Sequence, residues 1–94
     1  MDFARQHHYQ QVPAIGQRIQ GRILQARADF ERAPACFEQS LAALAALDDA
    51  VELARTQEAY GLFFQARNRA GDQERGAALL QEARATFARL GVRG

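Results

Sequence analysis

The sequence contains no lysine or tryptophan, and only one cysteine, one serine and one asparagine among its 94 residues. All twelve basic residues are arginine, which excludes the lysine of a phosphate-binding loop and lysine Schiff-base chemistry. The single cysteine, Cys36, allows neither an internal disulfide nor a Cys-x-x-Cys metal or redox pair. We therefore expect a protein without catalytic activity, cofactor or bound metal.

Long apolar runs are missing as well. No stretch reaches the roughly 18 consecutive apolar residues of a membrane span, and residues 1–12 lack the apolar segment of a signal peptide. A cytoplasmic protein without membrane contact is therefore expected. The charge is nearly balanced, at 12 basic and 11 acidic residues, and the arginines are spread along the chain rather than gathered in one cluster, so nucleic-acid binding is not favoured either.

What the sequence has in abundance is alanine and glutamine, with only two prolines to interrupt them, which favours helix throughout. Apolar residues recur at spacings of three and four, and this period is typical of amphipathic helices. The first helix is expected to begin near Pro13 and the second near Asp29, with a third over about 49–69 and a fourth that ends at Gly91. The pattern predicts an all-α fold of four main helices. Residues 1–12 are interpreted as an N-terminal extension or the tail of a preceding helix, and residues 13–94 as one domain.

An internal repeat organises these helices into two pairs. The segment Gly21–Arg27 (GRILQAR) recurs forty residues later as Gly61–Arg67 (GLFFQAR). Beyond it the offset becomes forty-three, where Asp29, Glu31 and Arg32 return as Asp72, Glu74 and Arg75. About three extra residues near 68–70 explain the change of offset. The two copies span about 13–47 and about 49–91, and each is expected to form a helical hairpin.

Acidic residues mark the expected turns. A carboxylate at a helix N-cap accepts hydrogen bonds from the free amides of the first turn, and Asp29 and the pair Asp48-Asp49 are placed for this role. The cluster Asp48, Asp49 and Glu52 lacks the spacing and the glycine of a calcium loop. We interpret these acids as capping residues rather than as a cation site.

The repeat resembles the tetratricopeptide pattern, in which small, apolar and aromatic residues follow one another at fixed helical spacing. The resemblance covers about residues 14–91 and is carried in the first copy by Gly21, Leu24, Ala28-Asp29, Ala33, Phe37 and Ser40, and in the second by Gly61, Phe64, Gly71-Asp72, Gly76, Leu80 and Ala83. The long second helices and the closing segment Ala83–Gly91 are also similar to the C-terminal repeats of large bacterial ATP-dependent transcriptional regulators and signalling ATPases. The resemblance implies an α-α superhelix and a regulatory, protein-binding role.

In tetratricopeptide arrays the first helix of each repeat lines a groove that often receives a peptide. Carried over from the matched glycines, the groove residues would be Ile15, Arg18, Arg22 and Gln25 in the first copy, and Arg55, Glu58, Leu62 and Gln65 in the second. Arginine side chains suit carboxylates, so Arg18, Arg22 and Arg55 would hold an acidic segment of a protein or peptide partner. The alternative is that these arginines are solvated and bind nothing.

A second functional hypothesis is self-association, because two repeats are fewer than the roughly three that cover their own apolar ends. Leu79, Phe87 and Leu90 on the last helix, or Ile19 and Ile23 on the first, would then pack against another copy in a homo-oligomer. The remaining reactive residues have structural explanations. Adjacent His7 and His8 are expected in a solvated terminus, and Cys36 and Ser40 as small residues between packed helices.

Overall fold

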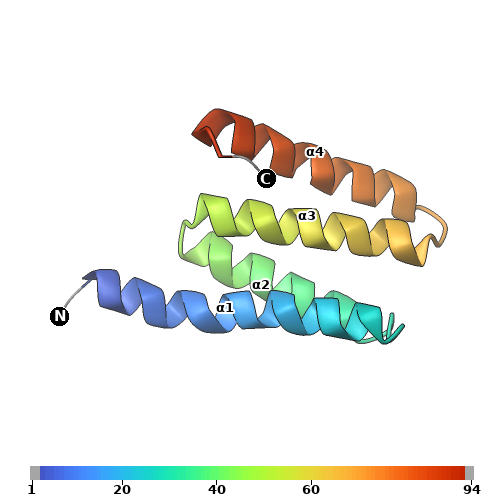
Figure 1. Cartoon of the computed structure of the whole chain (residues 1–94), viewed down its shortest axis with the longest axis horizontal. Coiled ribbons are helices and arrows are strands. Elements are labelled where there is room, and N and C mark those ends of the chain that lie inside the picture. The colour runs from blue at the N-terminus through green and yellow to red at the C-terminus, as the bar shows by residue number, and fades with distance from the viewer. Residues whose placement is uncertain (1–2, 93–94) are drawn as a thin grey trace.

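The computed structural model describes residues 3–92, with side chains from residue 7 onward. Over this range the chain forms four helices and no strand: α1 (Phe3–Ala26), α2 (Ala33–Ala46), α3 (Ala50–Arg67) and α4 (Asp72–Leu90). Successive helices run in opposite directions, so that α1 pairs with α2 and α3 with α4 (Figure 1). The prediction of an all-α fold built from two helical hairpins is confirmed.

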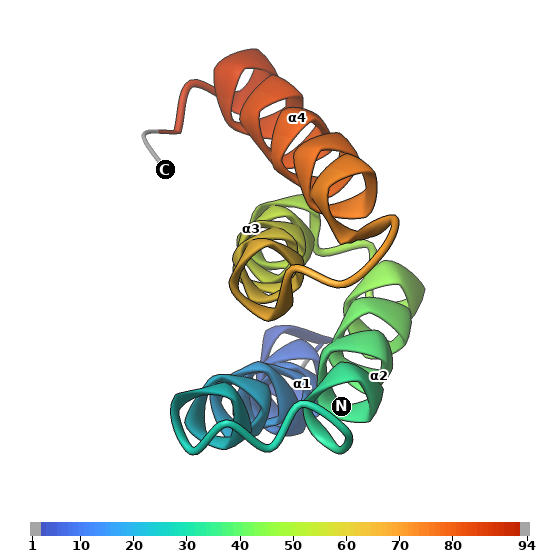
Figure 2. The ribbon, with the colours of Figure 1, turned by 90° about the vertical axis from the view of Figure 1, so that its right-hand side faces the viewer.

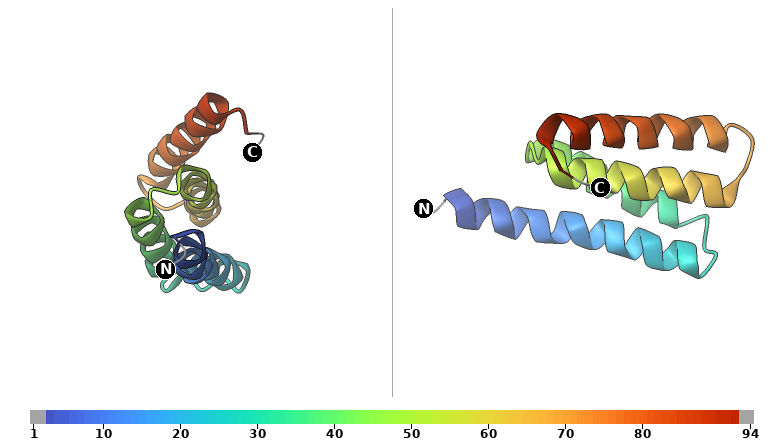
Figure 3. Two further views of the ribbon diagram at one scale, coloured as in Figure 1. Left: turned by 90° about the vertical axis from the view of Figure 1, so that its left-hand side faces the viewer. Right: turned by 45° about the horizontal axis from the view of Figure 1, so that its top comes forward.

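The two hairpins stack through α3, which contacts all three other helices. Seen end-on, α1 and α3 lie on one side of the array and α2 on the other, with α4 beyond α3 (Figures 2 and 3). The arrangement is elongated, with extents of 47 × 28 × 18 Å. The side formed by α1 and α3 is therefore a continuous surface made by the first helix of each copy.

Equivalent residues of the two copies form the same kind of contact between the helices of each hairpin. Gly21 lies so close to the ring of Phe37 that an added Cβ would be 3.0 Å from it, and a Cβ on Gly61 would be 2.9 Å from Leu80 Cγ. Phe37 and Leu80 are themselves equivalent residues of the repeat. Each hairpin thus needs a glycine where a large side chain of its second helix crosses the first.

The core between the hairpins is aromatic. Phe37 of α2 packs with Tyr60, Phe63 and Phe64 of α3, with ring centroids between 4.5 and 6.0 Å apart among these four residues. Phe37 and Phe63 have no exposed surface. Since burying one such side chain contributes about 1.5–3 kcal/mol, this cluster is a main reason why the two hairpins stay together.

The start of the first helix differs from the expectation. Pro13 lies inside α1, which runs without a break from Phe3, so residues 3–12 form the first turns of this helix. A proline inside a helix removes the hydrogen bond to the carbonyl four residues earlier. That carbonyl belongs to Tyr9, whose side chain is 63% exposed, so water can reach this stretch of α1. Gln11 also ties the segment to Asp49 through a 2.6 Å hydrogen bond.

The turns agree with the sequence in part. Asp49 caps α3 as predicted and accepts from the Glu52 amide at 3.3 Å. Asp29 does not cap α2, which begins at Ala33; its side chain accepts from the Arg32 amide within the turn before that helix. The extra residues of the second copy lie in the turn after α3, which ends at Arg67.

Candidate functional site

A cleft lies between α1 and α3, and we call it the α1–α3 cleft. It has a volume of about 400 Å³ and is lined by Arg18, Arg22, Gln25, Arg55, Glu58, Ala59, Leu62 and Phe87. Six of the eight residues singled out from the sequence as groove residues, all but Ile15 and Gln65, meet here. Gln65 is exposed further along α3, and Ile15 is half-buried on α1; neither lines the cleft.

Helical periodicity explains why these side chains converge. Arg18, Arg22 and Gln25 follow one another at spacings of four and three on α1, and so share one face of that helix. On α3, Arg55, Glu58 and Leu62 have the reverse spacing of three and four. Because α1 and α3 are side by side and run in the same direction, the two stripes form opposite walls of one cleft.

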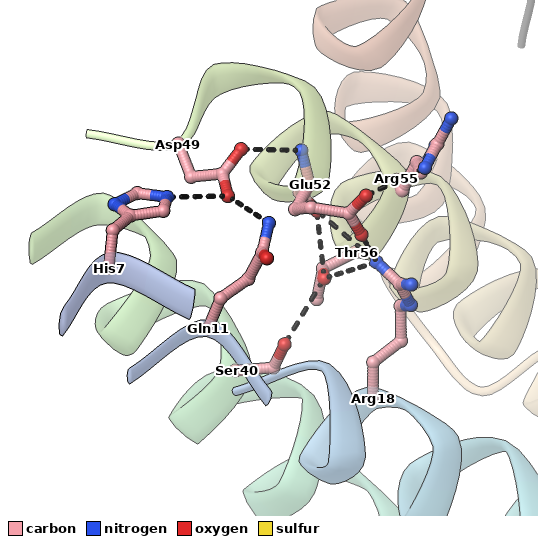
Figure 4. Close-up of polar contacts among 8 residues, drawn as sticks. All are labelled: His7, Gln11, Arg18, Ser40, Asp49, Glu52, Arg55 and Thr56. Carbon is pink, nitrogen blue, oxygen red and sulfur yellow. Dashed lines mark hydrogen bonds and ion pairs between the residues drawn. The ribbon is translucent and has the colours of Figure 1, made fainter. Parts of the chain in front are cut away.

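Arg18 is engaged within the protein. Its Nη1 atom donates to Glu52 Oε1 at 2.9 Å and lies 3.4 Å from both the Glu52 carbonyl oxygen and Thr56 Oγ1 (Figure 4). The exposed fractions of the two charged side chains are only 14% and 11%. A pair this buried joins α1 to α3 and compensates its own charge, so we assign Arg18 to holding the cleft together.

Two buried hydroxyls continue this contact into the core. Ser40 of α2 and Thr56 of α3 are fully buried, and their oxygens are 3.1 Å apart. Thr56 also donates to the carbonyl of Glu52 at 3.1 Å. As expected from the sequence, Ser40 is the small residue between packed helices, and here it also satisfies the hydroxyl of Thr56. Together with Arg18 and Glu52, these hydroxyls form a hydrogen-bonded network that connects α1, α2 and α3.

The other two arginines face the solvent. Arg55 donates to Glu52 Oε2 at 2.6 Å, but half of its side chain is exposed. Arg22 is exposed and forms no ion pair with the residues that the structure describes. The three arginines of the cleft thus differ in state: Arg18 is bound to Glu52, Arg55 shares that carboxylate, and Arg22 keeps its full hydrogen-bonding capacity.

The apolar part of the cleft comes from Leu62, which is 51% exposed, and from Ala59 and Phe87. Phe87 is the cleft residue that reasoning from the sequence missed, since it was expected on the last helix as a contact with another copy. It is only 5% exposed and packs with Ala54 and Ala83 between α3 and α4. The expectation that Phe87 packs against a second copy is wrong, because its surface is already used within the chain.

Among the described residues, no three His, Cys, Asp or Glu side chains lie close enough together to bind one metal ion. His7 approaches Asp49 with 3.5 Å between Nε2 and Oδ2 (Figure 4). His8 is exposed on α1. His7 is thus partly ordered against the start of α3. Cys36 is half-buried and packs against the aromatic core.

A second buried ion pair stabilises the far end of the α3–α4 hairpin. Asp72 accepts two hydrogen bonds of 2.8 Å from Arg67 and one of 2.8 Å from the Arg69 amide. The hydrogen bonds from Arg67 lower the pKa of Asp72 to about 2. The guanidinium of Arg67 also lies over the rings of Phe63 and Phe64, at 5.2 and 5.3 Å from their centroids.

A shallower hollow lies on the opposite side, between α2 and α4. Leu41, Leu79 and the edges of Tyr60 and Phe64 form its base, with Glu38 and Glu82 among its rim residues. Burial, and to a lesser extent the carboxylate of Glu38, raises the pKa of Tyr60. The phenol of Tyr60 therefore stays neutral, and its ring packs in the aromatic core. Leu79 is half-buried against this core, which leaves little of it for contact with another copy.

Comparison with protein families, with curated proteins and with solved structures finds no match to this chain. The tetratricopeptide resemblance consequently stays a prediction that rests on the residues of the two copies. Among the described residues, no helix has the length and apolar character needed to cross a membrane.

Proposed function

We propose that the chain is a non-catalytic protein-interaction module whose α1–α3 cleft binds an acidic segment of a protein partner. The observation that carries the proposal is the convergence of Arg22 and Arg55 with Leu62 in one cleft. Two helices from separate copies of the repeat contribute these side chains, which is the arrangement expected of an extended peptide site.

The chemistry of the cleft defines the segment that it fits. A guanidinium binds a carboxylate through two parallel hydrogen bonds, and such charge-assisted bonds are stronger than neutral ones. Arg22 is free to make them, and Arg55 has donors beyond the one that Glu52 takes. Leu62 and the edge of Phe87 offer an apolar contact beside them. The fitting ligand carries an aspartate or glutamate next to an apolar side chain.

A wider role follows from the resemblance of the sequence to bacterial regulators. A module of this size would act in a regulatory or signalling protein by bringing a partner into place, without changing it chemically. The contacts inside the cleft support a binding role, because Glu52 holds Arg55 in position before any ligand arrives and so reduces the entropy lost on binding.

The test uses a library of short synthetic peptides that combine one or two carboxylates with apolar residues, screened by fluorescence anisotropy. We expect Arg22→Ala to weaken binding of the best peptide by roughly 10- to 100-fold, the worth of a charged hydrogen bond. Arg84→Ala is the matched control, because Arg84 is an exposed arginine outside the cleft. Equal loss in both variants, or no binding by any peptide, would refute the proposal.

A further inference from the structure

The outer face of α1 is the largest gathering of exposed apolar side chains on the described part of the chain. Of the six large apolar residues that are exposed, four lie on α1: Tyr9, Val12, Ile19 and Ile23, with exposed fractions between 40% and 63%. Val12, Gly16, Ile19 and Ile23 follow one another at spacings of four, three and four, so they form one stripe. The stripe faces away from the core, which α1 contacts through Gly21 and Leu24.

In the second copy of the repeat, the equivalent face of α3 is covered by another helix. Forty residues later, the stripe corresponds to Glu52, Thr56, Ala59 and Phe63 of α3. There Thr56 and Phe63 have no exposed surface, because α2 packs on them through Ser40 and Phe37. The same face of α1 has no helix upon it among residues 3–92.

The last hairpin of a second copy is poorly suited to cover the exposed face of α1. Phe30, Phe37 and Leu41 are the residues through which the first hairpin packs on α3. Their equivalents on the second hairpin are Gln73, Leu80 and Arg84, of which the two polar ones are exposed. A second copy would therefore bury an arginine and a glutamine if it stacked head to tail, which is unfavourable.

We propose that a second copy of the chain covers this face, through antiparallel pairing of α1 with α1 about a two-fold axis. The spacing of the stripe reads the same in both directions, which a two-fold interface requires. In this register Ile19 of each copy lies over Gly16 of the other, Val12 lies against Ile23, and Tyr9 lies against Ala26. Large side chains meet small ones at the first and last of these contacts, and Gly16 has open space for the purpose, since an added Cβ would meet nothing within 4 Å.

Charge does not oppose the pairing. α1 carries no aspartate or glutamate, and among the α1 side chains that the structure describes Arg22 is the charged one beside the stripe. In the two-fold register the two Arg22 residues are offset by nine residues, or about 13 Å at 1.5 Å per residue. This exceeds the screening length of about 8 Å at physiological salt. One helix face covers less than the roughly 800 Å² per partner of a standard interface, so the expected dimer is weak and reversible.

The test measures the mass of the 94-residue chain by sedimentation equilibrium from about 1 µM to about 1 mM, because association follows mass action. We expect a monomer–dimer equilibrium that Ile19→Asp abolishes. Leu62→Asp is the matched control, with a leucine that is 51% exposed on α3 against 49% for Ile19. Helical content and Tm of each variant, measured at the low concentration, should stay close to those of the wild type, because both side chains are exposed.

Two further variants test the register. Gly16→Ile and Ile19→Gly should each weaken the dimer by at least about tenfold, and the double variant should restore it, because the large residue then faces the small one in the reverse order. A wild-type chain that stays monomeric throughout would overturn the proposal. So would a dimer that Leu62→Asp disrupts and Ile19→Asp does not, or a double variant no better than the single ones.

Discussion

Two glycine-to-alanine substitutions in helix interiors should change stability in opposite directions. Gly76 of α4 faces Gly61 of α3, and an added Cβ would lie 2.8 Å from the carbonyl oxygen of Gly61 and 3.1 Å from Gln65 Cγ. Gly16 of α1 has nothing within 4 Å of its added Cβ. Because the substitution is chemically the same at both positions, the difference between the two changes in stability measures the effect of tertiary packing.

The magnitudes follow from two terms. Alanine is favoured over glycine inside a helix by about 0.8–1.0 kcal/mol, and this gain applies at both positions. At Gly76 the close atom belongs to the backbone, so α3 and α4 must move apart, and such overpacking costs about 1–3 kcal/mol. We expect Gly16→Ala to raise the free energy of unfolding by nearly 1 kcal/mol and Gly76→Ala to lower it by up to about 2 kcal/mol.

Urea denaturation followed by circular dichroism measures both values, and thermal scans should show Tm shifts of about 4–8 °C per kcal/mol for a domain of this size. The measurements belong at low concentration, where the chain is monomeric. If Gly76→Ala stabilised the protein as much as Gly16→Ala, the close approach of α3 and α4 at their glycines would be refuted, and with it the packing described above.

Further predictions concern the polar contacts and one turn. Glu52→Ala leaves Arg18 without its partner and should lower the free energy of unfolding by about 1–3 kcal/mol in urea titrations, and the double variant Glu52→Leu/Arg18→Met should recover part of that loss. Asp72 has a pKa lowered from 3.8 to about 2, so its ionised form contributes stability that is fully present above about pH 4 and is lost as the pH falls toward 2. The stability difference between wild type and Asp72→Asn should shrink over that window, and a difference independent of pH would contradict the ion pair with Arg67. Ala28 has a φ of +60°, which costs a residue with a Cβ about 1 kcal/mol or more, so Ala28→Gly should raise Tm; an unchanged or lower Tm would argue against that turn.

Much of the candidate site was accessible from the sequence because it depends on periodicity. The spacing of Arg18, Arg22 and Gln25 puts them on one helix face whatever the rest of the fold does. The forty-residue offset then predicts that α3 carries a matching face with Glu58 and Leu62. Helix geometry and the equivalence of the two copies put these residues on matching faces, whereas the resemblance to the tetratricopeptide pattern implied that these faces line a groove. The cleft contains these residues.

The roles of the arginines were not accessible in this way. Arg18 and Arg22 are one turn apart and have the same chemistry, yet one is 14% exposed against Glu52 and the other is exposed without an ion pair among the described residues. The partner, Glu52, is 34 residues further along the chain. Only the stacking of α1 on α3 brings the two within hydrogen-bond distance, and no local pattern encodes that distance.

The start of α3 depends on a local contact and was predicted correctly, whereas the start of α1 depends on a contact with a distant segment and was not. Asp49 was predicted as the cap of α3 because capping involves residues three apart. The start of α1 was misjudged, since contact of Gln11 with Asp49 ties the turns before Pro13 to another hairpin. The helices, their pairing and the faces they present could thus be predicted from the sequence, since these features are local or repeated. Tertiary structure alone decided which charges are neutralised, that Phe87 is covered and that the outer face of α1 stays open, because burial depends on which segments meet in space.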